Sequence, residues 1–443
     1  MRRLLYKRLL EWKDSVDRKP LILEGARQVG KTYLLKEFGR KEFESMVYVN
    51  CHEAGDVGQI FAQDLNVKRI MQAIEAYTGQ RLKAGRTLLF IDEIQEVPHA
   101  IESLKYFCEN APELHIVAAG SLLGVVNRPG ESFPVGKVNI LRLYPMTFDE
   151  YLMAAGEDLL AQAISDCNWD VLSATQVKAT ELLRQYYYVG GMPEAVRCFV
   201  EHSDVNKVRA IQADILRTYA SDFAKHAGNE TQKIRMVWES IPAQLARENK
   251  KFIYGAVKSG GRARDFERAI QWLVDAGLSH SIHRCSKPEV PLKFYEDFNA
   301  FKLFLLDVGL LGAMAEVPAM QMLVSNNVFK EFKGAFSENF VLQQLIATPG
   351  VTVYYYSKDN STQEVDFLIQ VQGRIIPIEV KAEQNVKSKS LNRFITVDYA
   401  GKGLKGVRLS MQPYIDQGWM ENIPLYAVNG FIAKLRASSG GLV

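Results

Sequence analysis

The chain has 443 residues, of which 47% are hydrophobic and 24% charged, a composition typical of folded globular proteins that excludes a disordered or fibrous chain. Its 54 Lys and Arg nearly balance its 51 Asp and Glu, so the formal charge of +3 does not by itself indicate nucleic-acid binding. At roughly 150 residues per domain, the length predicts about three domains.

The cysteines and the hydropathy of the chain indicate the cellular compartment in which the protein is expected. The 5 cysteines are scattered and form no CxxC pair, which favours a reducing compartment over a disulfide or zinc framework. We expect no membrane span, because charged residues or Gly interrupt every apolar run well before about 18 residues. Together these features predict a cytoplasmic protein.

The first predicted element is a short apolar strand, Pro20–Leu23, which precedes a glycine-rich loop and a helical pattern at Tyr33–Phe38. The loop has the P-loop spacing G-x-x-x-x-G-K-T, in which Lys31 neutralises the β- and γ-phosphates and Thr32 ligates Mg²⁺. The predicted ATP-binding residues are Gly25, Ala26, Arg27, Gln28, Val29, Gly30, Lys31, Thr32, Tyr33, Asp92 and Ser121.

Three more strands are predicted in the first 150 residues, at Met46–Asn50, Thr87–Glu93 and His115–Gly120, and their alternation with helices implies a parallel sheet. Asp92 and Glu93 have the place of a Walker B pair, in which Asp92 holds Mg²⁺ and Glu93 polarises the attacking water. Alternatively, either acid caps the helix that follows. Ser121 either reaches the γ-phosphate or the water, or caps the next helix.

These motifs carry a family resemblance. The run Leu21–Leu152, with GARQVGKT, FIDEIQEVP, AAGSLLG, SFPVGKV and LYPMTFDEYL, resembles bacterial and archaeal AAA+ ATPases related to the STAND type, and the likeness extends to YVGGMPE at 188–194 in a helical lid. It implies ATP hydrolysis in a homo-oligomer, expected to be a hexamer, with a cation from a neighbouring subunit completing each site. Candidates for that cation are Arg128, Lys137, Arg142 and Arg217; for each, a surface salt bridge is the alternative.

The middle of the chain predicts a helical lid followed by a winged helix. Residues 151–228 have helical spacing, and helices are then predicted at Lys233–Asn249 and from Ala263 to a stop at Gly277. With the extended Ser279–His283 this order resembles a winged helix-turn-helix. Its predicted contacts to DNA phosphates are Lys258, Arg262, Arg264 and Arg268. The alternative is a solvated helix face on a domain that contacts proteins.

The last third contains a predicted hairpin, Gln363–Ile369 and Ile375–Lys381. Glu379 and Lys381 share one face because they are two residues apart, and the hairpin brings Asp366 near them. Asp366, Glu379 and the Val380 carbonyl are suited to hold Mg²⁺ or Mn²⁺, and Lys381 to position water and stabilise the transition state.

The spacing D-x12-E-x-K resembles the PD-(D/E)XK nuclease superfamily, with Val365 in place of the Pro. That resemblance adds Glu338, in the preceding helix, as a metal ligand. The alternative is an ordinary surface ion pair between Glu379 and Lys381. A basic margin is predicted either to grip DNA or to be solvated surface, and it comprises Lys387, Lys389, Arg393, Lys402 and Lys405.

The sequence thus predicts an α/β protein with a P-loop AAA+ parallel sheet (1–150), a helical lid (151–228), a winged helix (229–295) and a PD-(D/E)XK nuclease-like domain (296–443). The predicted function is ATP hydrolysis coupled to metal-dependent cleavage of duplex or branched DNA. The predicted catalytic residues are Lys31, Glu93, Asp366, Glu379 and Lys381. Two alternatives are a regulatory ATP switch, whose C-terminal domain recognises nucleic acid or protein without cutting, and a chaperone-like remodeller of proteins.

Overall fold

The computed structural model describes residues 1–53, 55, 57–121, 133–323, 333–358, 363–382 and 388–437. The chain divides into two compact units. The N-terminal unit comprises Arg2–Tyr144 and Asp275–Leu278; the C-terminal unit comprises Met1, Pro145–Val274 and Ser279–Val443. Among the described helices, none combines the length and the hydrophobicity that a membrane span requires.

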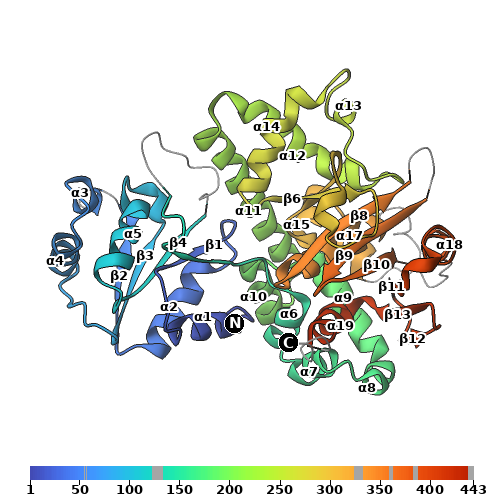
Figure 1. Ribbon diagram of the computed structural model, residues 1–443, viewed down its shortest axis with the longest axis horizontal. Helices are drawn as coiled ribbons and strands as arrows, with labels where there is room; N and C mark the ends of the chain where they lie inside the picture. Colours follow the sequence, from blue (N-terminus) through green and yellow to red (C-terminus); the bar gives the residue numbers. More distant parts are fainter. Residues whose placement is uncertain are drawn as a thin grey trace. The chain divides into compact units, whose positions relative to one another are not determined.

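The N-terminal unit is built on a five-stranded sheet with the order β2-β3-β4-β1-β5, in which all neighbouring strands run parallel (Figure 1). Its strands are β1 (Leu21–Glu24), β2 (Ser45–Asn50), β3 (Thr87–Asp92), β4 (His115–Gly120) and β5 (Asn139–Arg142). Its helices are α1 (Tyr6–Lys13), α2 (Lys31–Glu42), α3 (Val57–Ala62), α4 (Val67–Thr78) and α5 (Ala100–Asn110). Every residue of β3 and β4 is buried, as expected for a parallel sheet covered on both faces. The predicted parallel sheet is confirmed.

The C-terminal unit contains an eight-stranded mixed sheet with the order β12-β13-β11-β10-β9-β8-β6-β7. Its strands are β6 (Ser279–Cys285), β7 (Glu296–Leu305), β8 (Val351–Ser357), β9 (Glu364–Val371), β10 (Arg374–Lys381), β11 (Gly406–Ser410), β12 (Ile415–Asp416) and β13 (Met420–Pro424). The predicted hairpin is confirmed as β9 and β10, which pair antiparallel.

The helices of this unit are α6 (Phe148–Ala154), α7 (Asp158–Ser165), α8 (Trp169–Ala174), α9 (Gln176–Val189), α10 (Pro193–His202), α11 (Val205–His226), α12 (Thr231–Leu245), α13 (Tyr254–Val257), α14 (Ala263–Asp275), α15 (Val308–Met314), α16 (Ala319–Leu323), α17 (Lys333–Ala347), α18 (Lys389–Arg393) and α19 (Val428–Ala437). The order α12-α13-α14 followed by the antiparallel β6–β7 hairpin is the order expected of a winged helix. However, β6 also pairs with β8, so this hairpin shares a sheet with the strands after residue 296. The division into four domains stays a prediction.

The Gly190-Gly191 pair joins α9 to α10 and has a packing role. Gly190 has a φ of 74°, and a Cβ on Gly191 would lie 2.2 Å from the Met146 carbonyl oxygen. The Gly191 N–H donates to Oδ2 of the buried Asp307 at 2.6 Å, and the Gln343 amide donates to the same oxygen at 3.1 Å. The motif therefore ties the helices before residue 228 to α15 and α17.

Candidate functional site

The P-loop connects β1 to α2 and depends on backbone conformations that favour glycine. Gly25 and Gly30 have φ values of 153° and 95°. A Cβ on Gly25 would lie 2.3 Å from the carbonyl oxygen of Leu143, which is backbone and has little freedom to move. The loop is therefore held close to the end of β5, with the N-terminus of α2 following directly.

Lys31 is buried at the start of α2, and its ammonium donates to the carbonyl oxygens of Gly25 and Ala26, each at 2.8 Å. Burial lowers the pKa of Lys31 to about 8, although the negative charges of Glu93 and Asp92 act in the opposite direction. Those two carboxylates are thus close enough to Lys31 to form a common charged site.

Asp92 ends β3 and faces the P-loop. Its carboxylate accepts hydrogen bonds from the Tyr48 hydroxyl at 3.0 Å and from the Thr32 hydroxyl. Burial raises the pKa of Asp92, and both hydrogen bonds lower it. Asp92 and Thr32, predicted as Mg²⁺ ligands from separate motifs, are therefore adjacent.

Glu93 follows in a left-handed conformation with a φ of 48°. Its Oε2 accepts hydrogen bonds from the Gln95 amide at 2.7 Å and the Ser121 hydroxyl at 3.1 Å, and its side chain makes no capping hydrogen bond. The strained backbone and the two donors fix the carboxylate beside the P-loop, which is the requirement for orienting a water molecule.

Arg3 is a supporting residue that the sequence motifs do not indicate. Its guanidinium donates to the carbonyl oxygens of Val29 at 2.8 Å and Tyr144 at 2.6 Å, although it lies 26 and 141 residues away from them in the chain. Arg3 thus braces the P-loop from outside the site. An arginine in the basic segment before α1 carries no pattern from which this contact is predictable.

Of the four cations predicted to act on a neighbouring subunit, the three that the structure describes form ion pairs within their own chain. Lys137 pairs with Glu109 at 2.9 Å, Arg142 with Glu24 at 3.0 Å, and Arg217 with Asp214. These pairs match the surface salt bridges that were the alternative, and exposed pairs of this kind are weak enough to exchange partners. Arg128 lies outside the described residues. A role in the oligomer stays a prediction for all four.

The predicted nuclease residues lie on one face of the β9–β10 hairpin and on α17, which packs against β8 and β10. The register that pairs Ile378 with Phe367 places Asp366 opposite Glu379 at the next position. The Val380 N–H donates to Asp366 Oδ2 at 2.7 Å. It is therefore the amide N–H of Val380 that contacts this carboxylate. Lys381 lies 2.9 Å from Glu379 Oε1.

The acidic centre consists of Glu338, Glu364, Asp366 and Glu379. Two lysines that the motifs do not indicate contact it. Lys250, between α12 and α13, pairs with Glu338, and the fully buried Lys302 of β7 pairs with Glu364 and lies 3.8 Å from Glu338 Oε2. Burial alone would lower the pKa of Lys302, but the charges of Glu364 and Glu338 outweigh burial and hold it above its ordinary value. Among the residues that the structure describes, no group of three or more His, Cys, Asp or Glu is arranged to bind a metal ion.

Asp366 is perturbed toward its neutral form. Burial, and next the negative charge of Glu338, raise the pKa of Asp366 to about 7, while Lys302 and Lys250 lower it. The pKa of Glu338 itself is held below its ordinary value, because the charges of the two lysines outweigh burial. In this arrangement Lys250 and Lys302 compensate the negative charge of Glu338.

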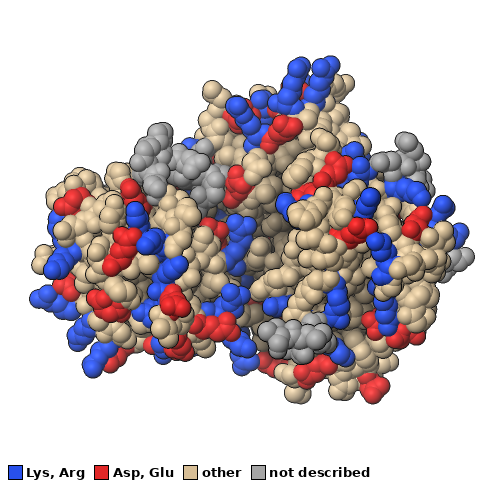
Figure 2. Space-filling model, in the orientation of Figure 1, with Lys and Arg blue, Asp and Glu red and all other residues tan. Residues whose placement is uncertain are grey.

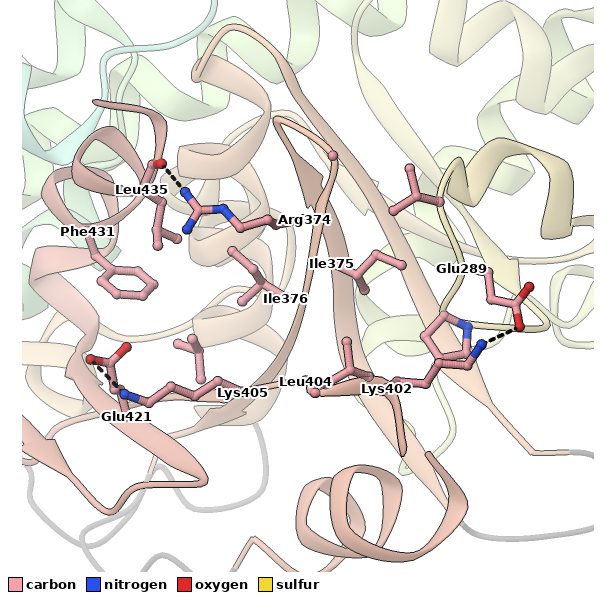
Figure 3. A pocket seen from close by; sticks show the side chains of 15 residues that line it. Glu289, Arg374, Ile375, Ile376, Lys402, Leu404, Lys405, Glu421, Phe431 and Leu435 are labelled. Carbon is pink, nitrogen blue, oxygen red and sulfur yellow. Dashed lines mark hydrogen bonds and ion pairs between the residues drawn. The ribbon is translucent and has the colours of Figure 1, made fainter. Parts of the chain in front are cut away.

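A pocket of about 610 Å³ lies elsewhere in the C-terminal unit, between the β9–β10 turn, β11 and α19 (Figure 3). Its floor is apolar, with Ile376 and Phe431, and none of the predicted nuclease residues lines it. Two basic-margin residues on its rim are paired with acids: Lys402 with Glu289 at 2.8 Å, and Lys405 with Glu421 at 3.4 Å.

The basic residues predicted to contact DNA in the winged-helix segment are exposed. Figure 2 shows Lys and Arg side chains gathered over α13 and α14, with acidic side chains beside them. The four predicted residues there, all exposed, are Lys258, Arg262, Arg264 and Arg268. Lys389 is exposed at the start of α18, and Lys387 lies outside the described residues.

A parallel sheet, a P-loop and a strand that ends at Asp92 and is followed by Glu93 define the N-terminal unit as a P-loop AAA+ ATPase fold. In agreement, residues 17–152 match the family model described as AAA domain. Residues 180–321 and 333–426 match two models described as domains of unknown function (DUF8612 and DUF4143). No match was found among curated proteins.

Among solved structures, the chain is similar to the Aeropyrum pernix Orc1 protein in complex with DNA, with 14% identity over 72% of this chain and 93% of that chain and a TM-score of 0.29. It is also similar to the Thermotoga maritima RuvB Holliday junction branch migration motor, with 15% identity over 65% and 89% and a TM-score of 0.31. Drosophila ORC bound to DNA matches with 16% identity over 70% and 93% and a TM-score of 0.26.

Proposed function

We propose that the chain is an oligomeric ATPase that hydrolyses ATP at the P-loop and binds duplex or branched DNA. The observation that carries ATP hydrolysis is the convergence of three motifs: buried Lys31, the Thr32–Asp92 contact, and Glu93 held by Ser121. A hydroxyl beside a carboxylate is a donor set that suits Mg²⁺, so the residues present fit the ion.

In this proposal Lys31 exchanges its two carbonyl partners for phosphate oxygens, and Thr32 and Asp92 hold the Mg²⁺ ion. Bound Mg²⁺ supplies charge neutralisation at the β- and γ-phosphates. Glu93 polarises the attacking water, and its hydrogen bonds from Ser121 and Gln95 set the orientation of the carboxylate. A cation from a neighbouring subunit, and the hexamer it implies, belong to the same proposal.

DNA binding is assigned to the exposed basic residues of the α13–α14 segment. Changing Arg262, Arg264 and Arg268 together to Glu should weaken binding of a fluorescein-labelled duplex or four-way junction by about 10²-fold and flatten its salt dependence, because phosphate contacts are lost. Fluorescence anisotropy across a salt series measures both effects.

A matched control carries the same change of charge on the exposed Lys68, Lys83 and Lys105 of the N-terminal unit. We expect this control to bind DNA within about threefold of the wild type. An equal loss in both variants would show that net charge, and not the α13–α14 surface, governs binding. Failure of DNA to bind the wild type would favour the protein remodeller or the regulatory switch.

Metal-dependent DNA cleavage is a second candidate function, favoured by the shared face of Asp366, Glu379 and Lys381. The carboxylates are donors that suit Mg²⁺ or Mn²⁺, and Lys250 and Lys302 engage Glu338, the predicted ligand on α17. We expect Asp366→Asn to reduce any cleavage of linear, single-stranded or branched DNA by on the order of 10²-fold, with ATP turnover retained. Equal cleavage by wild type and variant would contradict this assignment; cleavage by neither would favour the regulatory switch.

A further inference from the structure

The acidic centre of the C-terminal unit has its own cations. Four carboxylates gather there, from Glu338, Glu364, Asp366 and Glu379, and three lysines accompany them. Glu338 is only 3% exposed, and a carboxylate buried to that extent requires a compensating charge. Lys250 and Lys302 supply that charge at the same side chain, one from a loop and one from a strand.

The two lysines differ in how firmly they are held. Lys302 lies in the apolar strand β7, has no exposed surface, and places its ammonium 4.9 Å from the centre of the Tyr355 ring. Lys250 instead extends from the segment 246–253, whose residues 247–249 and 251 are exposed. Withdrawing Lys250 therefore requires movement of an exposed loop, whereas withdrawing Lys302 would disrupt a strand.

The loop that carries Lys250 is anchored at its far end. The Gln244 side chain accepts a hydrogen bond from the Ile253 N–H at 3.1 Å and donates to the Ile253 carbonyl at 2.9 Å, and the Phe252 N–H donates to the Phe301 carbonyl at 2.8 Å. These bonds set the point from which Lys250 reaches the centre, while residues 247–249 are free of the core.

The centre also has acceptors that remain unused. Oε2 of Glu379 and Oε2 of Glu338 are buried and accept no hydrogen bond within the described part of the chain, although the Lys302 ammonium lies 3.8 Å from the Glu338 oxygen. Both side chains are more than nine-tenths buried. Buried carboxylate oxygens without a donor indicate a ligand that these contacts do not provide.

We propose that Lys250 takes the place of a divalent cation at Glu338 and competes with that cation for the centre. Lys302 remains as a fixed counter-ion, and release of the Lys250 loop frees Glu338, Asp366 and Glu379 for the metal. This inference rests on the proposed cleavage function, because it concerns the same acidic centre.

The test is a titration of the full chain with Mn²⁺ in the absence of nucleotide and DNA, in which electron paramagnetic resonance measures free and bound Mn²⁺. The parent protein is the Asp92→Asn chain, in which the P-loop contributes no metal site, and every variant carries the same substitution. We expect Lys250→Met to bind one Mn²⁺ about tenfold or more tightly than the parent, because a competing positive charge is removed, and Lys250→Arg to bind as weakly as the parent. Circular dichroism checks that each variant is folded.

Adding Glu338→Gln to Lys250→Met should abolish the gained site, which locates the ion in the centre. The proposal is overturned by equal Mn²⁺ affinity in the parent and Lys250→Met, or by a gained site that Glu338→Gln leaves intact. Since neither ATP turnover nor DNA cleavage is measured, failure of this proposal is distinguishable from failure of the proposed functions.

Discussion

Replacing Glu93 by Gln should reduce steady-state ATP turnover by about 10²- to 10³-fold while ATP affinity changes only a few-fold. The substitution keeps the size of the side chain and its capacity to contact Ser121 and Gln95, but removes the charge that polarises water. Phosphate release measures turnover, and a fluorescent ATP analogue measures binding. Lys31→Ala should differ by weakening binding itself, because it removes the ammonium that the P-loop holds through two backbone carbonyl oxygens.

Two further variants separate orientation from chemistry at Glu93. Ser121→Ala removes one of two hydrogen bonds to the carboxylate, so we expect a smaller loss of turnover, about tenfold. Glu113→Gln, on the exposed segment before β4, makes the same chemical change away from the site and should leave turnover unchanged. Turnover retained in Glu93→Gln would show that another group orients the water.

The sequence indicates which side chains converge at the P-loop because each of them belongs to a short motif at the end of a buried strand. Lys31, Asp92 and Glu93 follow apolar runs whose length and composition indicate strands, and a parallel sheet brings the carboxyl ends of such strands together. The edge strand β5 was not predicted, since its residues alternate between partly buried and exposed and include Asn139 and Arg142. Nor does any local pattern indicate the support from Arg3.

The acidic centre was only partly predictable from the sequence. Asp366, Glu379 and Lys381 were predictable because strand alternation places them on one face of a hairpin. Lys250 and Glu338 are 88 residues apart, and their contact arises from packing of α12 and α17 around β7, which periodicity does not encode. The only local signal was Lys302 itself, a single charge within the apolar run Ala300–Leu306. A buried lysine implies a buried acid but does not say which one.

Lys302→Met should lower the free energy of unfolding of the C-terminal unit by about 3–5 kcal/mol, because Glu338 and Glu364 lose a fully buried partner. Met has a similar length, so the loss of packing is small. Urea denaturation followed by tryptophan fluorescence gives the change. The control is Lys293→Met, which removes a lysine paired with Glu296 but 67% exposed, and should change stability by less than about 1 kcal/mol.

The deficit of Lys302→Met should also depend on pH. Because the pKa of Asp366 is raised to about 7, the folded chain binds a proton there that the unfolded chain releases above about pH 4, so this group adds stability as pH falls from 7 toward 4. Removing Lys302 leaves more uncompensated negative charge, which strengthens proton uptake by the folded state. The deficit should therefore be largest at pH 8 and smaller at pH 5.5. A deficit that does not change with pH would indicate that Lys302 stabilises the unit by packing, and that its charge does not compensate the acids around it.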